Sequence, residues 1–62
     1  MNAHVYAYLQ NLTWDVMRAV PRNHTRQQAV AAILDAVKVY PAHHRQFIAS
    51  ATMSSLGYGG GI

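Results

Sequence analysis

The sequence predicts an all-α fold, a small three-helix array with a glycine-rich C-terminal extension. Two prolines divide the chain into three segments, and each segment repeats apolar residues at helical spacing. All four glycines fall within residues 57–61. We therefore expect helices near 3–20, 25–40 and 42–56, which form a three-helix domain over 1–57, followed by an arm over 58–62.

The first helix is predicted by apolar residues at spacings of four, three, four and four, which place them on one helical face. This inner row consists of Val5, Leu9, Leu12, Val16 and Val20. Asn2 precedes the row and is a suitable N-cap residue. Pro21 disfavours helical backbone at Val20, so we expect the helix to end there.

The second helix carries the sharpest local signal in the chain. Thr25 is followed three residues later by Gln28, ahead of an apolar run, which is the pattern of a capping box. Pro41 should end this helix and suits the first position of the next one. Its apolar face is predicted to consist of Ala29, Val30, Ile33, Val37 and Tyr40.

The third helix should end at Gly57, because glycine readily adopts the left-handed backbone that closes a helix. Its apolar residues fall into two groups on roughly opposite faces, Phe47, Ile48 and Ala51 against Ala49, Met53 and Leu56. The predicted core of the whole domain is Val5, Leu9, Leu12, Val16, Val30, Ile33, Leu34, Val37, Phe47 and Ile48.

Composition favours a chain that packs against a partner. Charged residues make up 11% of the sequence, against about 25% in a typical soluble domain, so the helices lack the usual charged outer face. A core of this size rarely contributes more than about 3–5 kcal/mol, and without cysteine no disulfide can add to it. Association with another chain is the remaining common source of stability.

The first helix also has an outer row of Ala3, Ala7, Gln10, Trp14 and Met17, which lies away from the inner row. We interpret this row as a partner surface anchored by Trp14, because tryptophan is enriched at binding hot spots. The alternatives are that the fold covers both rows, or that Trp14 is ordinary surface. The predicted partner interface is Ala3, Ala7, Trp14, Met17, Met53, Leu56, Tyr58 and Ile62.

Catalytic, cofactor-binding and metal-binding residues are not predicted. His43 and His44 are adjacent, so on a helix they point about 100° apart and cannot hold one ion together. The two carboxylates lie three residues before a basic residue, Asp15 before Arg18 and Asp35 before Lys38, as in ordinary helix-surface pairs.

Nucleic-acid binding is an alternative, since the net charge is +3. The candidate contacts are Arg18, Arg22, Arg26 and Arg45. Whether they form one patch depends on how the helices cross. Five scattered cations predict non-specific binding to phosphates that is lost at modest salt concentration.

The leading hypothesis is a non-enzymatic structural or accessory subunit of a larger protein assembly, such as a viral or phage particle component or a small subunit of a cellular complex. Self-association and protein partners both fit, and a small effector that docks on and inhibits a host protein shares the same interface features. We expect no secretory signal and no transmembrane segment, which favours an intracellular location or a place within a particle.

Overall fold

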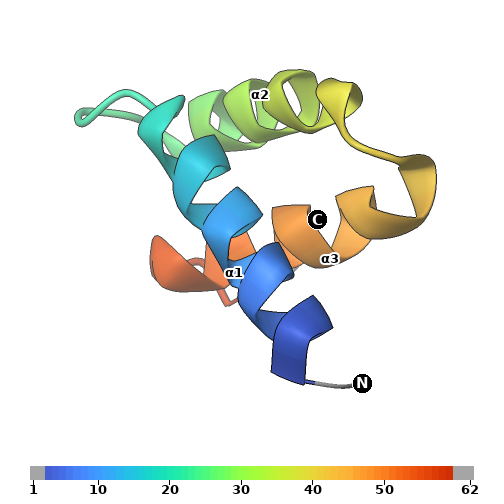
Figure 1. Cartoon of the computed structure of the whole chain (residues 1–62). Coiled ribbons are helices and arrows are strands. Elements are labelled where there is room, and N and C mark those ends of the chain that lie inside the picture. The colour runs from blue at the N-terminus through green and yellow to red at the C-terminus, as the bar shows by residue number, and fades with distance from the viewer. Residues whose placement is uncertain (1–2, 60–62) are drawn as a thin grey trace.

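Three α-helices and one short 3-10 helix make up the regular structure of the computed structural model, which describes residues 3–59. The order is α1 (Ala3–Arg18), α2 (Arg26–Ala36), the 3-10 helix η1 (Val37–Val39) and α3 (Ala42–Ser55). In Figure 1, α1 crosses in front of α3 and α2 lies above both. The described body measures 34 × 21 × 18 Å. The predicted all-α three-helix array is confirmed.

Helix α1 ends at Arg18, two residues earlier than the sequence predicts. Ala19 and Val20 donate their backbone N–H groups to Val16 and Met17, three residues back, so the chain tightens before Pro21. Because Val20 precedes a proline, it cannot continue the helix comfortably. The predicted N-cap, Asn2, lies outside the described residues.

The capping box at the start of α2 is present as predicted. The Gln28 backbone N–H donates to Thr25 Oγ1 at 3.1 Å, and the Thr25 N–H donates to Gln28 Oε1 at 2.9 Å. The predicted single helix up to Tyr40 is divided, however, because α2 tightens into η1 at Val37. Tyr40 has extended backbone (φ −101°, ψ 159°), as expected for a residue before proline.

Helix α3 ends in the glycine cap that the sequence predicts. Gly57 has φ +92°, and beyond Gly57 and its two chain neighbours no heavy atom lies within 4 Å of where a Cβ would stand. Its N–H donates to Ser54 O at 3.0 Å, and the Tyr58 N–H donates to Met53 O at 2.9 Å. These two bonds form a Schellman motif, which satisfies carbonyls that the end of a helix otherwise leaves unpaired.

The core lies among all three helices and η1, and α1 and α3 form the most extensive helix pair of the fold. Its buried apolar residues are Leu9, Val16, Ala29, Ile33, Val37, Ile48, Ala49 and Met53. Five of these were predicted. Two buried threonines, Thr13 and Thr52, donate their hydroxyls to the carbonyls of Leu9 and Ile48, so neither introduces an unsatisfied polar group.

Two predicted core residues are instead on the surface. Val5 is 40% exposed. It lies in the first turns of α1, where all of residues 3–8 are exposed, and the first buried residue of this helix is Leu9. Leu34 is 45% exposed, because α2 is covered on a single line of side chains four residues apart, Ala29, Ile33 and Val37. The predicted core residues Leu12, Val30 and Phe47 are partly buried against the core.

Candidate protein-docking surface

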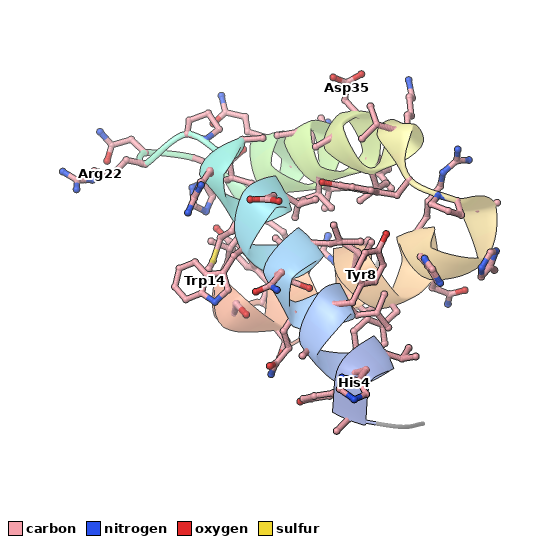
Figure 2. The ribbon with its side chains drawn as sticks, in the orientation of Figure 1. His4, Tyr8, Trp14, Arg22 and Asp35 are labelled. Carbon is pink, nitrogen blue, oxygen red and sulfur yellow. The ribbon has the colours of Figure 1, made fainter. Side chains whose placement is uncertain are left out.

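The outer row of α1 faces solvent along its length. Ala3, Ala7 and Gln10 are exposed, Met17 is half-buried, and the Trp14 side chain is 61% exposed. Figure 2 shows Trp14 projecting outward from the side of α1. Exposing a large aromatic side chain to water is unfavourable. A partner that covers the ring recovers this hydrophobic free energy.

Beside the outer row, α1 and α3 enclose a groove of about 300 Å³. We call it the Trp14 groove, and it is lined by Tyr6, Gln10, Thr13, Trp14, Met17, Phe47, Ala51 and Ser55. Every lining residue is uncharged, and Gln10, Trp14 and Met17 belong to both the groove and the outer row. Uncharged walls with a few hydroxyl and amide groups are typical of surfaces that bind an apolar side chain or helix.

The contribution of α3 to this groove was not predicted. Phe47 was placed in the core, and Ala51 was grouped with it, but Phe47, Ala51 and Ser55 follow one another at a spacing of four and line one wall. That spacing is the signal from which the wall could have been found. The spacing could not show on which side of α3 the helix α1 lies.

One residue of the predicted partner interface is misplaced. Met53 is fully buried, with an exposed fraction of 0%, and belongs to the core. It is buried because the α3 face that carries Ala49 and Met53 packs inward together with Ile48, so this face is not a second outer surface. Leu56 is partly buried against the same core, and Ile62 lies outside the described residues.

The C-terminal arm begins by folding back on its own chain. Tyr58 packs against the core, and its ring meets the His24 ring edge-to-face at a centroid distance of 5.7 Å. The His24 ring is fixed in turn by its Nδ1, which lies 2.7 Å from Pro21 O. Tyr58 therefore ties the end of α3 to the connector between α1 and α2.

The candidate nucleic-acid contacts are divided between the two ends of α2. Arg18 and Arg26 flank the first connector, and Arg22 lies on it, pointing outward in Figure 2. Arg45 is near the start of α3, beyond the other end of α2, an 11-residue helix about 16 Å long. The two groups therefore do not form a single patch.

Contacts within the chain engage Arg18 and Arg45. Arg18 approaches Asp15 at 3.8 Å, and the other predicted helix-surface pair, Lys38 with Asp35, is present at 3.6 Å. Arg45 donates through Nε to Tyr40 O at 2.9 Å and through Nη2 to Lys38 O at 3.0 Å. The Arg45 guanidinium thus caps carbonyls at the end of η1, which is a structural role.

Ring contacts are made by His24, His43 and His44. The His43 and His44 rings are 4.2 Å apart, and the Tyr8 ring meets His44 edge-to-face at 5.9 Å. Across residues 3–59, no three histidine or carboxylate side chains come together as a metal site would require. No helix in that part of the chain is both long enough and apolar enough to cross a membrane.

Comparison with known proteins adds no relative. No protein-family model, curated protein or solved structure matches this chain.

Proposed function

We propose that this chain is a non-enzymatic subunit of a larger protein assembly and that it docks through the Trp14 groove and the adjoining outer row of α1. The observation that carries the proposal is a single tryptophan, 61% exposed, at the rim of an uncharged groove. Tryptophan is enriched among the few residues that contribute most of the binding energy at protein interfaces.

The distribution of charge supports docking on this face. The charged residues of α1 are Asp15 and Arg18, which pair with each other and belong to neither the outer row nor the groove. A partner can therefore cover the surface without burying an unpaired charge, which would be costly. The surface combines apolar side chains with polar groups from Gln10 and Ser55, as interfaces between proteins commonly do.

Site-specific photo-crosslinking in the cell that produces the protein tests this proposal. A photoreactive amino acid replaces Gln10 in the groove, and the matched control replaces Gln27, an exposed glutamine on α2. Both are surface positions on helices, so the fold should tolerate both changes. We expect a discrete adduct from position 10 and none from position 27. No adduct from position 10, or the same adducts from both positions, would contradict docking through this face.

A further inference from the structure

We infer that the partner on this surface is a second copy of the chain, and that the two copies pair through antiparallel α1 helices. This inference rests on the proposed function and names the occupant of the same site. It follows from the spacing and the sizes of the outer-row residues and from the polar residue at their middle.

The spacing of the outer row is that of a helix-pairing seam. Ala3, Ala7, Gln10, Trp14 and Met17 follow one another at intervals of four, three, four and three. This is the 3.5-residue repeat that keeps one stripe of a helix turned toward a partner helix along its whole length. The seam spans about 21 Å, from the first turn of α1 to its last.

The sizes of the side chains select the antiparallel direction. The seam has small residues at its N-terminal end, Ala3 and Ala7, and large ones at its C-terminal end, Trp14 and Met17. Parallel copies would set Trp14 against Trp14 and alanine against alanine, so the helices would be forced apart at one end and leave a gap at the other. Antiparallel copies set each alanine opposite a large side chain, which keeps the helix axes at an even distance.

Gln10 occupies the middle of the seam and defines the two-fold axis. With the axis beside Gln10, Ala3 lies opposite Met17 of the second copy and Ala7 lies opposite its Trp14. The two Gln10 amides then face each other, and each carries both a donor and an acceptor, so they can bond reciprocally. A single polar residue in an apolar seam fixes the register of paired helices in this way.

The first two turns of α1 are available for this pairing. All side chains of residues 3–8 are exposed, and Tyr6 in this stretch also lines the Trp14 groove. In the antiparallel pair, the Tyr6 ring approaches Trp14 of the second copy on each side of the two-fold axis. The paired surface therefore contains two aromatic contacts related by symmetry, as in a self-complementary interface.

The dimer should be a weak one. A stable interface covers about 800 Å² on each partner, which is close to a fifth of the 4268 Å² surface of the described chain. Trp14 and Tyr6, which are 61% and 50% exposed, offer roughly 100–150 Å² each, and the rest of the seam consists of smaller contributions. We expect an equilibrium between monomer and dimer that depends on concentration.

Sedimentation equilibrium between about 1 μM and 1 mM, where an interface of this size dissociates, provides the first measurement. We expect the mass to rise from 6.9 kDa toward twice that value, with a blue shift of the Trp14 emission as the ring leaves water. Trp14→Ala should weaken the dimer at least about 30-fold, as loss of a hot spot does, while circular dichroism stays unchanged.

Cysteine crosslinking determines the direction of the pair, since the natural chain has no cysteine. An isotopically labelled Ala3→Cys chain is mixed with an unlabelled Met17→Cys chain and treated with a short bis-maleimide. Antiparallel pairing predicts mixed adducts by mass spectrometry, whereas parallel pairing predicts adducts of like with like. Gln27→Cys on α2 should give neither, and Gln10→Cys, on an exposed position at the axis, should couple to itself.

The outcomes separate this inference from the proposed function. A chain that remains a 6.9 kDa monomer at the highest concentration overturns the inference, and so do adducts of like with like. If the photoreactive group at position 10 then labels a different protein, the docking role stands and only the identity of the partner is wrong. If it labels nothing, both fail together.

Discussion

The inner and outer rows of α1 both recur at helical spacing, yet the fold covers mainly the inner one. From Leu9 onward the inner row packs against α3, whereas the outer row keeps a 61% exposed tryptophan. Periodicity identifies the faces of a helix that can be buried. How many of them are buried depends on how many neighbours the helix has, and α1 packs closely against α3 and only lightly against α2.

The largest expected effect is a difference in unfolding free energy between a substitution in the inner row and one in the outer row. Leu9→Ala removes a core side chain that is 3% exposed and should cost about 2–5 kcal/mol, which is comparable to the whole stability expected of a domain this small. Trp14→Ala, measured at concentrations that keep the chain monomeric, should change stability by less than about 0.5 kcal/mol. Urea unfolding followed by circular dichroism compares the two. An equal loss from both variants would mean that Trp14 supports the monomer.

The next prediction compares the two halves of the inner row by making the same substitution, valine to alanine, in each half. Val16→Ala removes two buried methyl groups and should cost about 2 kcal/mol, whereas Val5→Ala acts on an exposed position and should cost less than about 0.5 kcal/mol. Thermal unfolding of the two variants side by side measures the difference. Similar losses at both positions would show that the first turns of α1 are packed as tightly as the last.

These contrasts explain which features could be predicted from the sequence. The capping box at Thr25, the glycine cap at Gly57 and the helix ends before Pro21 and Pro41 depend on residues within a few positions of one another. Such local hydrogen bonds are determined by neighbouring residues, so the two caps were predicted correctly. The helix ends were predicted only approximately, since α1 ends at Arg18 and α2 gives way to η1 at Val37.

The predictions of burial that were wrong depend on contacts between residues far apart in the chain. Val5 and Leu34 have the right periodicity but stay exposed, and Met53, predicted on an outer face, is fully buried in the core. The outer row and Trp14 were identified from spacing alone. The groove beside them was not, because its second wall depends on how α3 crosses α1.

A smaller loss of stability is expected at the end of α3, where the conformation of the backbone matters more than side-chain packing. Gly57→Ala should cost about 1–2 kcal/mol, because an alanine at φ +92° bears the strain of left-handed backbone. The space around the new Cβ is open, so no steric clash adds to this cost. Ser55→Ala, on the exposed last turn of α3, is the control and should leave the melting temperature nearly unchanged. A melting temperature that Gly57→Ala does not lower would mean that the chain end can be rebuilt without the Schellman motif.

The smallest predicted effect is at the start of α2, which lies away from both rows of α1. Thr25→Ala removes the hydroxyl that accepts from the Gln28 N–H and should cost about 1 kcal/mol, whereas Thr25→Ser keeps that oxygen and should retain most of the stability. Because the cap acts on α2 alone, the loss should be the same in the monomer and in the paired chain. Urea unfolding at low and at high chain concentration measures both. If the cost of Thr25→Ala grows as the chains associate, α2 takes part in the interface, and the covered surface extends beyond the outer row of α1.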